Sequence, residues 1–109
     1  MHENNIAIQI DGIPTHIKPM GYCIASNKIT VDGEKVGFMY REELVDIEDS
    51  GWRFMVGTET EEYLEDPANG KIFDVNIIAN HDKAIIPFLS MKIGSELERV
   101  GDSFVVLED

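Results

Sequence analysis

The sequence predicts a small α+β domain: a strongly bent antiparallel sheet of about five strands, with a partly open barrel as an alternative form, and one or two short helices. Residues 36–41 and 52–56 alternate between two kinds of side chain, as strands with one buried face do. Similar short apolar stretches recur between glycine-containing turns, and helix signals are confined to brief segments.

The two alternating stretches supply the expected core. We expect the core face to be formed by apolar residues of both strands: Val36, Phe38 and Tyr40 on the first, and Trp52, Phe54 and Val56 on the second. An aromatic pair at matching spacing on each strand suits the core face of a small sheet.

The composition indicates a packed protein of one domain, residues 1–109, with 43% hydrophobic residues. The single cysteine, Cys23, excludes an intramolecular disulfide and fits a reducing compartment. Neither a signal-peptide pattern nor an apolar run of about 20 residues occurs. We therefore expect a cytoplasmic protein without a membrane segment.

The net charge of −12 is large for a chain of 109 residues. It disfavours binding to nucleic acid or anionic membranes, which require positive patches. Two interpretations remain: the acidic surface serves solubility, or it steers the protein toward a basic partner.

The first 20 residues precede the core, which we expect over residues 21–109. Residues 6–17 form either a hairpin turning at Asp11-Gly12 or a loosely attached lead-in, and Pro14 and Pro19 weaken the hairpin. Residues 21–26 are typical of a strand with Cys23 and Ala25 on one face. Residues 29–31 then form a short strand or a connector.

The middle of the chain combines an acidic loop with a short helix. Residues 42–50 contain five acidic residues and predict a loop with at most one helical turn. Residues 58–66 predict a helix capped by Thr58 or Thr60 and ended by Pro67. Its first-turn acids suit the helix dipole, and Tyr63 and Leu64 would supply its few buried contacts.

The last third of the chain is less regular. Residues 72–79 fit both a strand and a helix, and we slightly favour a short helix capped by Asp74. Residues 84–89 are extended or begin a helix, residues 95–99 predict one helical turn, and residues 102–107 predict a final strand.

Five blocks occur in a fixed order: CIASNKITVDGEKVGFMYREE, DSGWRF, EEYLEDPAN, DVNIIANHDKAIIP and IGSELERV. In this order they resemble the bacterial domain family DUF2185, also classed as Imm33-like immunity proteins. The resemblance runs from about residue 23 to residue 99. It implies a protein that binds and neutralises a toxin domain of a polymorphic toxin system, and it carries over no catalytic motif.

The predicted function is therefore a non-enzymatic immunity protein with a protein partner, such as a basic toxin domain. The candidate partner contacts are Tyr40, Arg41, Glu42, Glu43, Asp46, Glu48, Asp49, Trp52, Arg53, Glu61 and Glu62. The competing interpretation packs Trp52 in the core and pairs Arg53 with Asp49 or Glu59 on the surface. A regulatory module that binds a small molecule or peptide near Trp52 and Tyr40 is the alternative function. The oligomeric state is not indicated.

We predict no catalytic residue, metal site or cofactor. His81 beside Asp82 resembles a base oriented by a carboxylate, but adjacent side chains seldom point at one another. The acidic run at residues 46–49 lacks the glycine and the spacing of a calcium loop. Cys23 is most simply a small buried hydrophobe.

Overall fold

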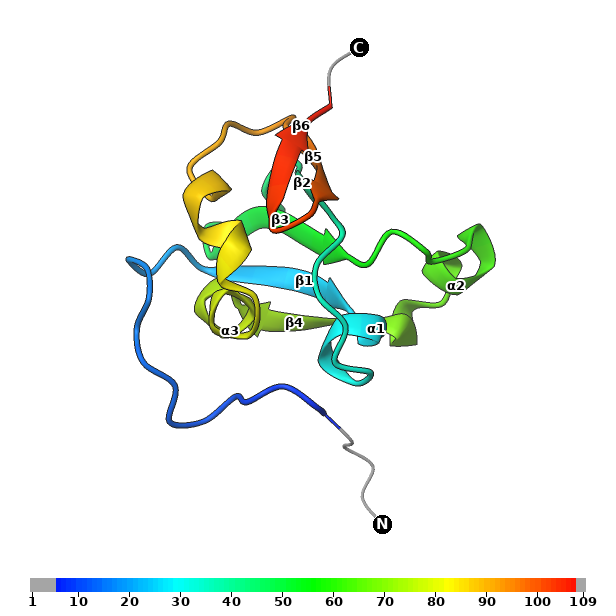
Figure 1. Ribbon diagram of the computed structural model, residues 1–109, viewed down its shortest axis with the longest axis horizontal. Coiled ribbons are helices and arrows are strands. Elements are labelled where there is room, and N and C mark those ends of the chain that lie inside the picture. Colours follow the sequence, from blue (N-terminus) through cyan, green and yellow to red (C-terminus); the bar gives the residue numbers. More distant parts are fainter. Residues whose placement is uncertain (1–5, 108–109) are drawn as a thin grey trace.

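The computed structural model describes residues 6–107, so the ends of the predicted domain, residues 1–5 and 108–109, lie outside it. All described strands belong to one sheet with the order β4-β1-β3-β2-β5-β6 (Figure 1). The strands are β1 (Tyr22–Ser26), β2 (Phe38–Arg41), β3 (Asp49–Met55), β4 (Gly70–Asp74), β5 (Glu96–Val100) and β6 (Ser103–Val106). The helices are α1 (Asn27–Thr30), α2 (Glu61–Glu65) and α3 (Val75–His81), and the 3-10 segments are η1 (Pro67–Asn69) and η2 (Lys83–Phe88).

The α+β class is confirmed, and the sheet is open because β4 and β6 form its two edges. Its bend is visible in Figure 1, where β1 and β4 run across the view and β6 runs up it. The expectation of a purely antiparallel sheet was wrong in one place, because β1 pairs with β3 in parallel. Strand β2 pairs with β3 on the side away from β1, so β1 and β3 are direct neighbours, and they run in the same direction.

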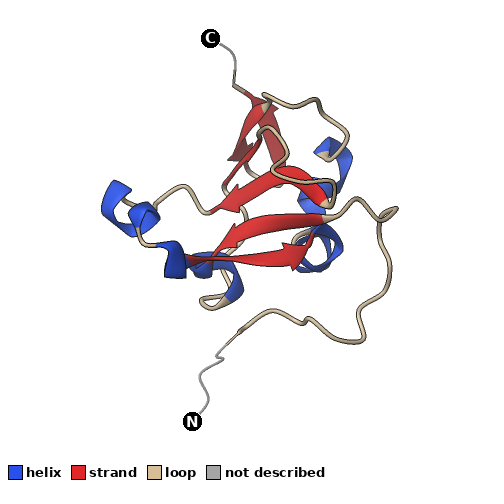
Figure 2. Ribbon diagram, turned by 180° about the vertical axis from the view of Figure 1, so that it is seen from behind, coloured by secondary structure: helices blue, strands red, loops and turns tan. Residues whose placement is uncertain are grey.

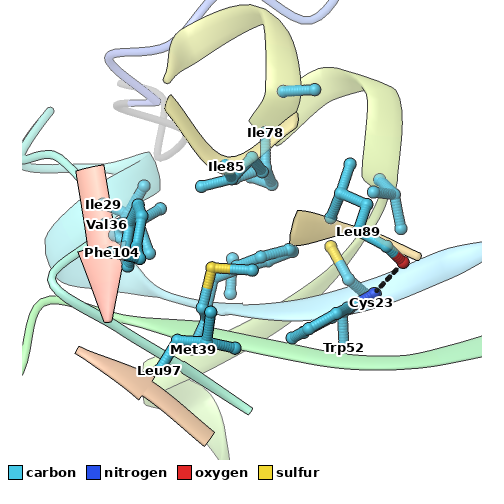
Figure 3. Close-up of a cluster of buried hydrophobic side chains, with 14 of the residues drawn as sticks. Cys23, Ile29, Val36, Met39, Trp52, Ile78, Ile85, Leu89, Leu97 and Phe104 are labelled. Carbon is cyan, nitrogen blue, oxygen red and sulfur yellow. Dashed lines mark hydrogen bonds between the residues drawn. The ribbon is translucent and has the colours of Figure 1, made fainter. Parts of the chain in front are cut away.

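The two faces of the sheet differ. The helix-covered face packs against α3 and η2 and holds the buried cluster of Figure 3, including Cys23, Met39, Trp52 and Leu97. Trp52 stacks on Phe54 with ring centroids 6.0 Å apart, and its indole N–H donates to the Leu89 carbonyl at 3.1 Å. Seen from behind, no helix covers the central strands, and α2 projects beyond the sheet (Figure 2). We call this second side the open face.

The predicted core face is correct for β3 and wrong for β2. Met39 lies opposite Phe54 and is fully buried, whereas Phe38 and Tyr40 are partly exposed on the open face. Val36 is also buried, but it precedes the strand, and its N–H donates to the Asp82 carboxylate at 2.9 Å. The alternation of residues 36–40 is therefore interrupted before β2 begins.

Three further local predictions need correction. The hairpin alternative for residues 6–17 was wrong, because residues 6–20 contain no strand; the segment is a lead-in, but it is anchored rather than loose, since Ile8 is buried and the His16 N–H donates to Asn76 at 2.8 Å. The short strand or connector expected at residues 29–31 is replaced by helix α1 at residues 27–30. Residues 96–100 form β5 instead of a helical turn, because they pair with both β2 and β6.

The capping signals were reliable. Thr60 caps α2 through the Tyr63 N–H at 3.0 Å, and Asp74 caps α3 through the Asn76 N–H at 2.9 Å. The favoured helix at residues 72–79 is therefore confirmed from Val75 onward, and the strand alternative is right for the preceding residues. Helix α2 contains no buried residue, so the predicted contacts of Leu64 are absent from the core.

Candidate functional site

A buried cluster of charges lies on the open face where the acidic loop meets β3. The guanidinium of Arg53 donates to both oxygens of Asp49, at 3.0 and 2.9 Å, and through Nε to Glu42 at 2.6 Å. The side chains of Arg53 and Asp49 are buried, whereas that of Glu42 is 49% exposed. One cation and two carboxylates leave the cluster with a net charge of −1.

A bulge in β3 brings the charged residues of this cluster close together. Between the pairs Tyr22↔Asp49 and Ile24↔Arg53, β1 advances by fewer residues than β3, so the register shifts. Gly51 lies in the bulge at φ +86°, where a Cβ atom would come within 2.5 Å of the Glu42 carbonyl oxygen. Only glycine is readily accommodated there. Residues four positions apart share a face of a regular strand but lie about 13 Å apart. The bulge shortens this distance and brings Asp49 and Arg53 within bonding distance.

The charged states of the pair are strongly stabilised. Hydrogen bonds from Arg53 hold the pKa of Asp49 well below its usual range and outweigh the opposing effect of burial. The same bonds raise the pKa of Arg53. Asp49 also accepts the N–H groups of Val45 at 3.0 Å and Gly51 at 2.8 Å. It therefore ties the acidic loop to the sheet.

The loop at residues 42–48 presents apolar side chains to solvent. Ile47 is 94% exposed, Val45 72% and Leu44 44%. Two residues hold the loop in place. Asp49 accepts the Val45 N–H, and Tyr22 donates its N–H to the Glu48 carbonyl at 3.0 Å and its hydroxyl to Asp46 at 2.9 Å. Exposed apolar residues on an anchored loop are typical of a binding surface.

A hollow of about 380 Å³ opens on the same face, between this loop and the segment from α2 to η1. Its lining includes Ile24, Tyr40, Met55 and Leu64, together with the carboxylate residues Glu42 and Asp66. Burial raises the pKa of the Tyr40 phenol, and the neighbouring carboxylate of Glu42 adds to this effect. The alternative function requires an apolar pocket near Trp52 and Tyr40; this hollow is lined by Tyr40 and not by Trp52.

The sequence matches a family model described as the immunity protein Imm33 domain over residues 23–106. The chain belongs to the Imm33 immunity protein family. This confirms the resemblance drawn from the five sequence blocks, and the matched range contains the acidic loop, α2 and every residue that lines the hollow. No curated protein matches the chain significantly. No solved structure does so either.

The predicted contact residues of the Imm33 domain fall into three groups. The accessible group consists of Tyr40, Glu42, Glu43, Asp46, Glu48, Glu61 and Glu62, which lie in or beside the loop, the hollow and α2. Asp49, Trp52 and Arg53 are buried, so they support the surface without forming it. Arg41 belongs to the helix-covered face, where it donates to the carbonyls of Ser50 and Met91 and lies 5.7 Å from the Trp52 ring.

The packing of Trp52 in the core is confirmed, and Arg53 does pair with Asp49, although the pair is buried rather than on the surface. Leu44, Val45 and Ile47 were not among the contacts predicted from the sequence. Apolar residues interspersed among carboxylates in a predicted loop were the available signal. Ile24 and Leu64 in the hollow were also missed, because their exposure depends on which face of the sheet the helices cover.

His81 and Asp82 do not form an oriented pair. The Asp82 carboxylate is buried and pairs with Arg99 at 2.8 Å, whereas Nε2 of His81 lies 3.0 Å from the Glu34 carbonyl. Among residues 6–107, no group of three or more His, Cys, Asp or Glu side chains is placed to hold a metal ion. Within the same range, no helix is both long and apolar enough to cross a membrane.

Proposed function

We propose that this Imm33 domain is a non-enzymatic immunity protein that binds the toxin domain of a polymorphic toxin system and neutralises it by covering its surface. The loop at residues 42–48 provides the central contact, and the N-terminal turn of α2 provides a second. One sheet and one buried core cluster support the proposal that residues 1–109 act as a single domain. Family membership supports the immunity role.

The observation that carries the loop assignment is the exposure of Ile47 and Val45 on an anchored loop. A loop whose backbone is already anchored loses little further conformational entropy when a partner covers it. Most of the free energy gained by burying its apolar side chains is then available for binding. The carboxylates on the same loop surround this apolar centre, as polar residues surround the centre of many interfaces.

The first prediction concerns the apolar residues of the loop. The double substitution Val45→Ser and Ile47→Ser is expected to weaken toxin binding by about 100-fold, since a few central residues carry most interface energy. Tagged protein would first be used to capture a toxin domain from its host's lysate. Affinity for the purified toxin domain and growth rescue during co-expression would then be measured.

Val100→Ser provides the matched control, because Val100 is 59% exposed but lies at the end of β5, outside the loop. It is expected to bind and rescue like the wild type. All variants should unfold at nearly the same urea concentration as the wild type, since the substituted side chains are exposed. Unchanged affinity in the double variant would contradict the loop assignment.

The second prediction distinguishes electrostatic steering, which changes the association rate, from direct contact, which changes the dissociation rate. Neutralising exposed carboxylates of the loop and α2, by Glu43→Gln, Glu48→Gln, Glu61→Gln and Glu62→Gln, is expected to slow association about tenfold at low salt. It should also flatten the salt dependence, because the steering field is screened by ions. The dissociation rate should change little. Stopped-flow association at several salt concentrations measures both quantities.

The control neutralises four exposed carboxylates elsewhere: Asp11→Asn, Asp32→Asn, Glu34→Gln and Asp102→Asn. It changes the net charge equally but is expected to retain most of the association rate. Equal slowing by both sets would show that only the total charge matters and would reject α2 and the loop as the steered surface.

A further inference from the structure

We propose that the hollow between the loop and α2 receives an arginine or lysine side chain of the bound toxin domain. This inference rests on the proposed function and deepens it by assigning the chemistry of one contact. Three properties carry it: an apolar floor that is left open, a charge cluster with an excess negative charge, and carboxylates at the rim.

The floor of the hollow suits the aliphatic stem of a long basic side chain. Ile24 and Leu64 are 37% and 49% exposed, and Met55 and Tyr40 are partly exposed beside them. Long cationic side chains bury their methylene groups on apolar surface while the charged head reaches polar groups. At about 380 Å³, the hollow is large enough for one such side chain and lies within the size range of small-molecule sites.

The charges select a cation rather than an anion. Arg53 also lines the hollow, but it already donates to Asp49 and Glu42, so its positive charge is compensated twice within the protein. The half-exposed carboxylate of Glu42 and the exposed Asp66 then contribute negative charge to the hollow. An incoming carboxylate or phosphate would be repelled by both, and by the net charge of −12.

A neutral apolar side chain fits less well than a basic one. It would cover the carboxylates of Glu42 and Asp66 and remove their water without supplying a hydrogen-bond donor, which is costly. A guanidinium or ammonium group supplies donors and charge together. An arginine or lysine side chain can therefore cover the apolar floor with its methylene groups and pair with the acidic rim through its charged head.

The test is an NMR titration of the full chain with N-acetyl-arginine methylamide and N-acetyl-lysine methylamide as probes. At least one is expected to shift the backbone amides of Ile24, Met55, Leu64 and Gly70 in a saturable manner. The citrulline and norleucine analogues, which keep the aliphatic part of the side chain without its charge, should bind at least tenfold more weakly. Equal binding by the neutral analogues, or shifts only outside the hollow, would overturn the proposal.

Substitutions locate the charge that is responsible. Glu42→Gln and Asp66→Asn are each expected to weaken binding of the basic probe several-fold. Asp66→Asn keeps a side-chain oxygen for the Ala68 N–H, which donates to Asp66 at 2.9 Å, so the chain should retain its local structure. Glu43→Gln removes the same charge outside the hollow lining and should have no effect. Unchanged binding in both hollow variants would overturn the assignment.

The titration is independent of the loop assignment. The variant carrying Val45→Ser and Ile47→Ser keeps the hollow lining and should bind the basic probe normally. If the probes fail while this variant loses toxin affinity, the basic subsite is rejected and the proposed function stands. If the probes bind while the loop variant keeps full toxin affinity, the loop contact is rejected instead.

Discussion

Asp49→Asn is expected to lower the free energy of unfolding by about 3 kcal/mol, the size of effect seen when one partner of a buried ion pair is removed. The substitution leaves Arg53, which is 3% exposed, with the half-exposed carboxylate of Glu42 as its only negatively charged hydrogen-bond partner. It also weakens the hydrogen bonds to the N–H groups of Val45 and Gly51. Urea denaturation at pH 7 measures the change.

Glu42→Gln is the control, because it removes a carboxylate from the same arginine at a half-exposed position. Its expected cost is about 0.5 kcal/mol, as for ion pairs that remain in contact with water. Equal costs for the two substitutions would contradict the view that burial makes Asp49 the main partner of Arg53.

The contribution of Asp49 should depend on pH. Its pKa is lower in the folded protein than the value of about 3.9 for an unfolded chain. The unfolded state therefore binds more protons in acid, so this contribution is complete above about pH 5 and is lost as the pH falls below about 4. The difference in stability between the wild type and Asp49→Asn should shrink over that range. A constant difference would exclude a lowered pKa.

Asp82→Ala is expected to cost about 3 kcal/mol, because Asp82 connects three parts of the fold. Its buried carboxylate accepts the Val36 N–H at 2.9 Å, caps η2 through the Ala84 N–H at 3.2 Å and pairs with Arg99 at 2.8 Å. Removal leaves the Val36 N–H without an acceptor in the core. Thermal and urea denaturation would measure the loss.

His81→Ala provides the comparison, since the neighbouring histidine is only partly buried and contacts the Glu34 carbonyl rather than Asp82. Its expected cost is about 0.5 kcal/mol. Asp82→Asn should recover part of the stability, because an amide oxygen can still accept an N–H but cannot pair with a cation. A catalytic pair would show the opposite: loss of an activity with either substitution at unchanged stability.

Local sequence was sufficient for much of the fold because its signals act over a few residues. The caps Thr60 and Asp74 bond to N–H groups two or three positions later, so they mark helix starts without knowledge of the rest of the chain. The alternation in β1 correctly predicted that Cys23 and Ala25 share one face, and both residues are buried. The Imm33 family was likewise evident from the ordered sequence blocks, because each block is a run of neighbouring residues.

The faces of β2 and the identity of β5 required the assembled sheet. Residues 96–100 have a weak strand pattern but lie between β2 and β6, and pairing on both sides overrides the local preference. Phe38 and Tyr40 have the pattern of core residues, yet the register that joins Met39 to Phe54 turns them to the open face. A shift of one residue exchanges the faces of a strand, and a single sequence does not show where such a shift occurs.

Some parts of the candidate site can likewise be predicted from the sequence, and others depend on the tertiary structure. Composition and charge pattern identified the acids of α2 and the acidic loop, although the loop was predicted to run to residue 50 and β3 already begins at Asp49. These properties are carried by neighbouring residues. The buried Asp49–Arg53 pair, the outward position of Ile47 and the hollow beside Leu64 depend on the bulge at Gly51 and on the side of the sheet that α3 and η2 cover. Those arrangements arise from contacts between residues far apart in the chain, so only the tertiary structure decides them.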